Sequence, residues 1–120
     1  MVYLNFVKKA KEQDARNVFE KYNGCLDIIP EEIKPFFCEY NPVRLVIDDD
    51  GIDICFASVE KLYELQKNYA YIGAQLIFAT CNGDPIFYND SKIYTCPHGV
   101  QTPEWEQLAD NFMEYLDSII

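Results

Sequence analysis

The stretch Leu76–Thr95, LIFATCNGDPIFYNDSKIYT, contains three apolar or aromatic segments separated by two groups of turn-forming residues. In the first turn, Asn82–Pro85, the Asn and Gly accept the positive φ angles of a tight hairpin, and Pro85 lacks an N–H for strand pairing. The second turn is Asn89–Ser91, whose side chains can bond the nearby backbone. This stretch therefore predicts a three-stranded meander around which the rest of the chain is organised.

A hairpin is predicted before the meander. Val43–Ile47 is rich in β-branched residues, and Asp48–Gly51 ends in the Asp-Gly pair that tight hairpins favour. The returning strand is Ile52–Phe56, whose alternation places Ile52, Ile54 and Phe56 on one face.

Three helices are predicted before the meander. The first spans about 12–22 and ends at Asn23-Gly24, where Gly24 would adopt the left-handed conformation. A short second helix begins at Pro30, which suits a first helical turn. The third follows Ser58, which we predict to be its N-cap.

The C-terminal segment has the strongest helical pattern. Thr102 is a suitable N-cap, and Pro103 suits the first helical position. Apolar residues follow at helical spacing and form one wide stripe: Trp105, Leu108, Ala109, Phe112, Met113 and Leu116. We expect this helix to cover one face of the meander, with Trp105 in the core.

Together these elements predict an α+β fold with a mostly antiparallel sheet, made of the hairpin and the meander and flanked by N-terminal helices and a C-terminal amphipathic helix. A chain of 120 residues is long enough for one domain, so we expect residues 1–120 to form a single domain. The aromatic residues of the meander alternate and must occupy both faces of the sheet: Phe78, Phe87, Tyr88 and Tyr94. The C-terminal helix can cover only one face of the sheet. The other face would be covered by the N-terminal helices or remain partly open, as a protein-binding surface.

The formal net charge is −10, and residues 1–22 contain more basic than acidic side chains, so the acidic excess lies in the rest of the chain. Such a charge repels nucleic acid and anionic membranes, and it attracts basic proteins. An acidic surface that only keeps the protein soluble is the alternative interpretation.

The five cysteines are odd in number and contain no C-x-x-C pair: Cys25, Cys38, Cys55, Cys81 and Cys96. This pattern fits reduced, buried thiols of a cytosolic protein better than a disulfide framework. The apolar run Met1–Val7 is too short for a secretory signal, and lysines follow it instead of preceding it. No window is apolar over the length of a membrane span, so we expect a cytoplasmic protein.

No arrangement of residues predicts catalysis. The only histidine, His98, lies in a loop where it cannot easily face Cys96, so we interpret it as a structural residue that bonds the backbone. A metal site from Cys81, Cys96 and His98 would lack a fourth ligand, and Asp48–Gly51 lacks the spaced oxygens of a calcium loop. We therefore expect a protein without enzymatic activity, metal or cofactor.

Residues 79–88, ATCNGDPIFY, resemble the core pattern of the SUKH superfamily, which includes fungal cell-wall assembly regulators and many bacterial immunity proteins. Leu108–Leu116 is similar to the closing helix of that family, Ile29–Lys34 to its early Leu-Pro segment, and Phe56–Leu62 to its strand-to-helix step. The chain departs from the pattern at 40–42, where Tyr-Asn-Pro replaces the family's Asn-Gly-Gly.

The resemblance implies an intracellular bacterial immunity protein that binds and neutralises a polymorphic or contact-dependent toxin, often a nuclease. We expect a monomer that meets a basic toxin domain through acidic side chains. Charge and expected exposure predict these contact residues: Asp48, Asp49, Asp50, Asp53, Asp84, Tyr88 and Asp90. They cannot all share one patch, because alternate turns of a meander lie at opposite ends. The alternatives are a regulatory or scaffold module for an endogenous protein, and a protein with a small-ligand pocket.

Overall fold

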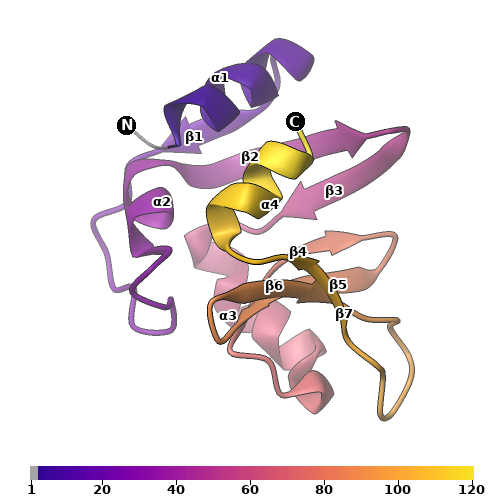
Figure 1. The fold of residues 1–120 in the computed structure, drawn as a ribbon. Helices are drawn as coiled ribbons and strands as arrows, with labels where there is room; N and C mark the ends of the chain where they lie inside the picture. The colour runs from indigo at the N-terminus through magenta and orange to yellow at the C-terminus, as the bar shows by residue number, and fades with distance from the viewer. Residues whose placement is uncertain (1–2) are drawn as a thin grey trace.

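Seven strands form one antiparallel sheet in which neighbours in space are also neighbours in sequence (Figure 1). The structure is a computed structural model that describes residues 3–120. Met1 and Val2, the first two residues of the apolar run Met1–Val7, lie outside the described residues. The strands are β1 (Val18–Glu20), β2 (Asn41–Asp49), β3 (Ile52–Phe56), β4 (Leu76–Cys81), β5 (Asp84–Asn89), β6 (Lys92–Thr95) and β7 (Glu106–Ala109). The predicted α+β class is confirmed.

Four α-helices and one short 3₁₀ helix accompany the sheet: α1 (Leu4–Gln13), α2 (Lys34–Glu39), α3 (Val59–Asn68), η1 (Ala70–Ile72) and α4 (Phe112–Ser118). In Figure 1, α4 lies in front of the sheet and α3 lies behind it. Within residues 3–120, no helix has the length and apolar character that crossing a membrane requires.

The hairpin and the meander form as predicted, because their turns depend on local backbone chemistry. Asp50 and Gly51 have φ angles of 55° and 87°, and Asn82 and Gly83 have φ angles of 52° and 86°. Two successive positive φ angles give a turn whose twist matches that of the strands on either side. The turn between β5 and β6 has the same character, with positive φ angles at Asp90 and Ser91.

The N-terminal helix predicted at 12–22 is wrong. The buried stripe that forms a helix is Phe6, Val7 and Ala10, so α1 ends at Gln13, and residues 18–20 pair with β2 as β1. Gly24 is not among the glycines with positive φ. A Cβ there would lie 2.6 Å from the Tyr22 hydroxyl oxygen, so a larger residue would require the Tyr22 side chain to move.

The second helix also begins later than predicted. Residues after Pro30 form turns, and α2 starts at Lys34 with Pro35 in its first turn. There the missing N–H of Pro35 removes no helical hydrogen bond.

The long C-terminal helix predicted from Thr102 is wrong as well. Residues 106–109 instead add β7 to the open edge of β6, and α4 begins only at Phe112. The Asn111 side chain caps α4 by accepting a hydrogen bond from the Glu114 backbone N–H at 2.9 Å. Trp105 therefore lies outside a helix and is 37% exposed, although the helical pattern predicted it in the core.

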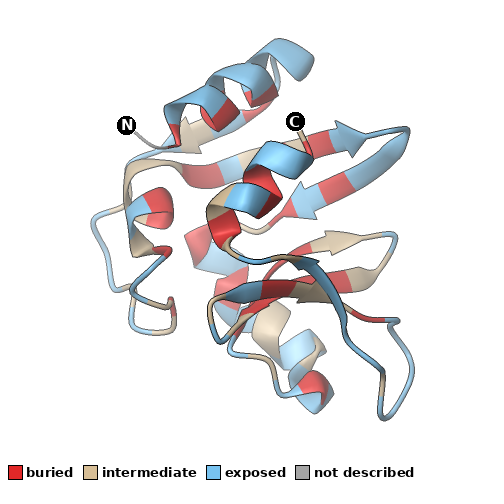
Figure 2. Cartoon of the chain, viewed as in Figure 1, coloured by how far each residue is buried: buried red, intermediate tan, exposed pale blue. Residues whose placement is uncertain are grey.

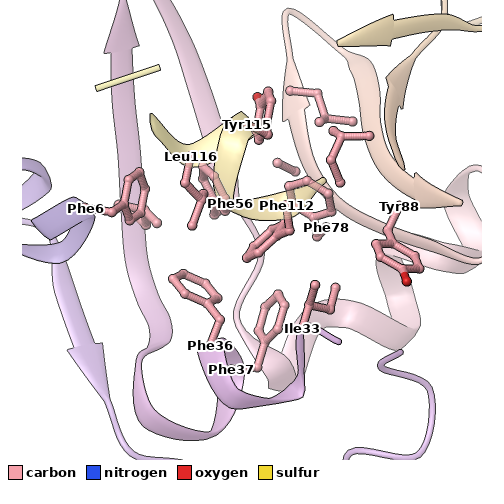
Figure 3. Packing of buried hydrophobic residues seen from close by; sticks show 14 of the residues in the cluster. Phe6, Ile33, Phe36, Phe37, Phe56, Phe78, Tyr88, Phe112, Tyr115 and Leu116 are labelled. Carbon is pink, nitrogen blue, oxygen red and sulfur yellow. The ribbon is translucent and has the colours of Figure 1, made fainter. Parts of the chain in front are cut away.

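The larger core lies between the sheet and α1, α2 and α4, and it also includes Val59 and Leu62 from the first turn of α3 (Figures 2 and 3). Its aromatic rings meet edge to face, with the Phe36 and Phe112 centroids 5.3 Å apart and those of Phe78 and Phe112 5.2 Å apart. Such contacts add to the stabilisation that comes from burying apolar area. The N-terminal helices thus share this core with the C-terminal helix, so the prediction that they cover the opposite face is wrong.

A smaller core occupies the other face of the meander. Phe87 and Ile77 pack there with Ile72 of η1, and Leu65 of α3 packs against them. Aromatic residues occupy both faces of the meander, as predicted, and both faces are covered.

All five cysteines are free. Only Cys96 is buried, whereas Cys25 and Cys55 are exposed, so the predicted burial of the thiols is wrong for most of them.

Candidate binding site

Five of the seven predicted contact residues gather at one end of the sheet. The β2–β3 and β4–β5 turns meet there because Ile54 near the start of β3 pairs with Cys81 at the end of β4 (Figure 1). This acidic end consists of Asp48, Asp49, Asp50, Asp53 and Asp84. All are exposed except Asp84, which is half-buried.

The other two predicted contact residues lie elsewhere. Asp90 is exposed in the β5–β6 turn at the opposite end of the sheet, where its backbone N–H donates to the Gln75 side chain. Tyr88 is only 4% exposed and belongs to the larger core. Its prediction as a contact residue therefore fails, because its side chain is buried in that core.

Two carboxylates face each other across the hairpin at the acidic end. Asp48 and Asp53 are direct cross-strand partners in the β2–β3 register. Asp48 also accepts a 2.8 Å hydrogen bond from the Gly51 backbone N–H, which holds the turn. Like charges at opposite positions destabilise a sheet by a few tenths of a kcal/mol, so this arrangement opposes stability.

A depression of about 400 Å³, here named the α4 pocket, lies between the acidic end and α4. Its carboxylates are Asp49 and Asp84. Its walls are largely apolar and include Ile54, Ile86 and Ile119.

A second depression, here named the β7 pocket, has a volume of about 350 Å³ and shares Asp84 and Thr95 with the first. It is lined in addition by Glu104, Trp105 and Glu106. No lysine or arginine lines either pocket. The two depressions adjoin at these shared residues, and we refer to them together as the acidic groove.

Trp105 provides the aromatic surface of the β7 pocket. Its ring packs against Phe87 and Tyr94, with centroid separations of 4.8 and 5.4 Å, so its position is fixed although its outer face is accessible. An aromatic face beside carboxylates is suited to a cationic group, which interacts favourably with both.

His98 holds Asp84 in place between the two pockets. The backbone N–H of His98 and its ring Nδ1 both contact Asp84 Oδ1, at 3.0 and 2.6 Å. The prediction that His98 bonds the backbone is therefore wrong, because its partner is a side chain. The side-chain hydrogen bond of His98 lowers the pKa of Asp84, which keeps this carboxyl ionised.

The Tyr115 hydroxyl group is the one buried side-chain polar group in residues 3–120 without a hydrogen-bond partner. Tyr115 is 3% exposed, lines the α4 pocket, and lies on the opposite side of the core from Phe36 and Phe37 (Figure 3). Burial raises the pKa of Tyr115, so the hydroxyl stays protonated. A buried polar group left unpaired costs about 1–3 kcal/mol.

Sequence reasoning missed Glu104, Trp105 and Glu106 as site residues, because it assigned them to a helix. The useful signal was the spacing of Asn111 and Glu114, which matches the first and last positions of a capping box. In the structure the Asp110 backbone N–H, and not that of the N-cap residue, donates to Glu114 Oε2 at 3.3 Å. Placing the helix start at this pair would have left residues 104–109 free to form a strand.

Within residues 3–120, no group of three or more His, Cys, Asp or Glu side chains is arranged to hold a metal ion. The groove instead offers carboxylates, one accessible aromatic ring and apolar walls, which can bind a large cationic group.

Comparison with protein-family models, curated proteins and solved structures gave no match. The resemblance to the SUKH superfamily therefore stays a prediction from the sequence.

Proposed function

We propose that this chain is a non-enzymatic binding protein whose acidic groove recognises a basic protein. The observation that carries the proposal is the lining of the two adjoining pockets, which contains four carboxylates and neither lysine nor arginine. They belong to Asp49, Asp84, Glu104 and Glu106.

The energetics of the acidic end support this proposal. The facing pair Asp48 and Asp53 destabilises the free protein, and a cationic partner would relieve the repulsion. Natural proteins break a local rule of stability chiefly at functional sites.

The half-exposed Trp105 supports a protein partner. Tryptophan is enriched in protein interfaces, where it supplies much of the binding energy. Here it lies between two glutamates at the margin of the groove. A partner that presents basic side chains could contact the carboxylates and the ring at the same time.

The resemblance to the SUKH superfamily gives this proposal its specific form. We expect a cytoplasmic immunity protein that neutralises a toxin, and a nuclease is the natural target because its substrate-binding surface is basic. The carboxylates would then occupy the positions that substrate phosphates take. Co-expression tests this form: the chain should restore growth to cells that express the toxin encoded beside its gene. Failure to protect, together with failure to bind that toxin, would contradict it.

The first testable prediction concerns association kinetics with the basic partner recovered by affinity capture. We expect the triple variant Asp48→Asn, Asp49→Asn, Asp50→Asn to associate roughly tenfold more slowly at low salt, because electrostatic steering is lost. Stopped-flow measurements at about 10 mM and 150 mM salt should show the difference shrink as the Debye length falls from roughly 30 to 8 Å.

The matched control makes the same change in charge at the opposite end of the sheet. It combines Glu31→Gln, Glu32→Gln and Asp90→Asn; the Ser91 hydroxyl places Glu32 at that end by donating to its carboxylate at 2.6 Å. We expect the control to associate at nearly the wild-type rate. Equal slowing in both variants would show that only net charge matters, and an unchanged rate in the first would remove the β2–β3 turn from the site.

A further inference from the structure

The α4 pocket combines exposed or half-buried carboxylates with buried apolar walls. Asp49 is exposed and Asp84 half-buried, so their carboxylates lie toward solvent. Ile54, Ile86 and Tyr115 are buried and form the deeper part. A ligand that fills the pocket must therefore combine a polar, cationic part with an apolar stem.

The carboxylates and hydroxyl groups of the pocket offer acceptors, and the Asn82 side chain adds an amide. The Thr95 and Ser118 hydroxyls donate their protons to the carbonyl oxygens of Pro85 and Tyr115, at 2.8 and 2.6 Å. Within residues 3–120, the Asp49 carboxylate has no hydrogen-bond or ionic partner, and His98 occupies only Oδ1 of Asp84. The ligand must supply several N–H donors.

The unpartnered Tyr115 hydroxyl is an independent sign that a ligand belongs in this pocket. Buried polar groups in native proteins almost always have a partner. Tyr115 is more than nine-tenths buried and lines the pocket, and the carboxylates that line the same pocket are Asp49 and Asp84. A donor from the ligand would satisfy the hydroxyl oxygen.

We propose that the α4 pocket receives an arginine side chain of the protein partner, bound by the Asp49 and Asp84 carboxylates and the Tyr115 hydroxyl against the isoleucine walls. The inference rests on the proposed function, since it names the group through which the basic partner is recognised. A guanidinium group has five donors in a planar fork, which can serve three acceptors at once. Its aliphatic stem can pack on apolar walls while the charged head contacts carboxylates.

An arginine explains the pocket better than a lysine or a free amine. The lysine ammonium is compact and strongly hydrated, so it is less suited to a site with apolar walls. The pocket also shares Asp84 and Thr95 with the β7 pocket, so a larger molecule that carries its occupant can contact both depressions. The volume of about 400 Å³ falls within the usual range of ligand sites.

The test uses Nα-acetyl-arginine methylamide as the probe, with methyl NMR of the purified chain. We expect saturable shifts confined to methyl groups that line the pocket, such as those of Ile54, Ile86 and Ile119, with a dissociation constant of roughly 1 mM. The citrulline analogue has almost the same shape without the charge, and it should bind at least tenfold more weakly. The lysine analogue should bind more weakly than the arginine probe.

Two variants assign the contacts. Asp49→Asn should weaken arginine binding about tenfold, because a charge-assisted hydrogen bond is lost. Tyr115→Phe should weaken it about threefold while leaving the unfolding midpoint of the free protein equal or higher, because it removes an unsatisfied hydroxyl group. Asp90→Asn makes a matched change of charge outside the pocket and should bind the probe as the wild type does.

Several results would overturn the arginine pocket. They are the absence of saturable shifts, equal binding of the citrulline analogue, and unchanged binding by both Asp49→Asn and Tyr115→Phe. Binding of agmatine more than about 100-fold tighter than the arginine probe would identify a small-molecule site instead.

The two proposals fail separately. If the probe does not bind but the triple aspartate variant still slows association with the basic partner, only the arginine pocket is wrong. If the probe binds and no basic protein associates with the chain, the pocket holds a guanidinium group but the proposed function is wrong.

Discussion

At the scale of single residues, Asn41 shows how a side chain distant in sequence replaces a local cap. Its Oδ1 accepts a hydrogen bond from the Val59 backbone N–H at 2.8 Å, and its Nδ2 donates to Glu60 Oε1 at 3.0 Å. Ser58 occupies the N-cap position of α3, as predicted, but its side chain makes no capping hydrogen bond. Asn41 is the first residue of β2 and is only 2% exposed, so a buried strand residue caps α3.

We expect Asn41→Ala to lower the free energy of unfolding by about 2 kcal/mol, because the Val59 N–H loses its partner in a buried site. Urea unfolding measures this change as a lower midpoint. Ser58→Ala is the control and should cost less than about 1 kcal/mol. If Ser58→Ala proved the costlier change, Asn41 would not be the effective cap.

At the scale of elements, side-chain amides complete the hydrogen bonding of strands where strand pairing stops. Asn17 donates to the Val46 carbonyl oxygen at 3.2 Å and accepts from its N–H at 3.0 Å. Gln13 makes the same pair of bonds with Asp48. β1 pairs with β2 only as far as Arg44. The side chains of Gln13 and Asn17 therefore bond backbone groups of β2 that would otherwise be exposed at the edge of the sheet.

Gln66 performs the same role between α3 and β4. Its side chain donates to the Ile77 carbonyl oxygen and accepts from the Ile77 N–H, both at 2.7 Å. The pairing of β3 with β4 extends only over residues 79–81 of β4, so Ile77 lies outside it. A side chain of α3 thereby bonds the part of β4 that β3 leaves unpaired.

We expect Gln66→Leu to cost about 3 kcal/mol, because the N–H and C=O of the buried residue Ile77 lose their partner together. Amide hydrogen exchange at Ile77 should accelerate along with the fall in unfolding free energy. Gln101→Leu, at an exposed loop position, is the matched control and should change stability by less than about 0.5 kcal/mol. Similar losses in both variants would argue against a bonding role for Gln66.

At the scale of the whole molecule, one carboxylate joins α1, the segment before β1, and β2. Asp14 accepts from the Arg16 Nε and Nη2 atoms at 3.1 and 3.0 Å, and from Arg44 Nη1 at 3.0 Å. The side-chain hydrogen bonds of Arg16 are the main cause of a pKa of Asp14 well below its usual value. At the acidic end, by contrast, no lysine or arginine forms an ion pair with a carboxylate within residues 3–120.

The lowered pKa of Asp14 sets the sign of a pH dependence. Because the unfolded chain binds this proton more readily, the stabilisation is complete above the unfolded pKa of about 4 and is lost as pH falls through the lower folded pKa. Asp14→Asn should therefore be less stable than the wild type at pH 7, and the difference should shrink as pH falls below about 4. Urea unfolding between about pH 7 and pH 2 measures it.

The exposed residue Asp117 provides the control for this experiment. Within residues 3–120 it has no ionic partner, so the difference between wild type and Asp117→Asn should stay nearly constant across the same pH range. A difference for Asp14→Asn that stayed constant or grew in acid would contradict the role of the ionised carboxylate.

The features that could be predicted from sequence are those that depend on neighbouring residues. The positive φ angles at Asp50-Gly51 and Asn82-Gly83 follow from residue types that tolerate them, so both hairpins were predictable. The acidic end also needs the pairing of β3 with β4, which neighbouring residues do not specify. Helical periodicity was misleading at Trp105, since a helical stripe does not show whether a strand edge nearby needs a partner. Residues 106–109 pair with that edge as β7, and they thereby bring Trp105 to the groove.

The sequence by itself determined the turns, the antiparallel meander and the excess of carboxylates, because each depends on local backbone preference or on composition. Only the tertiary structure decided that Tyr88 is buried, that Tyr115 lines the α4 pocket without a hydrogen-bond partner, and that Glu104 and Glu106 join Asp84 around one groove. The physical reason is that burial and hydrogen-bond satisfaction are properties of packed neighbours, which come from segments far apart in the chain.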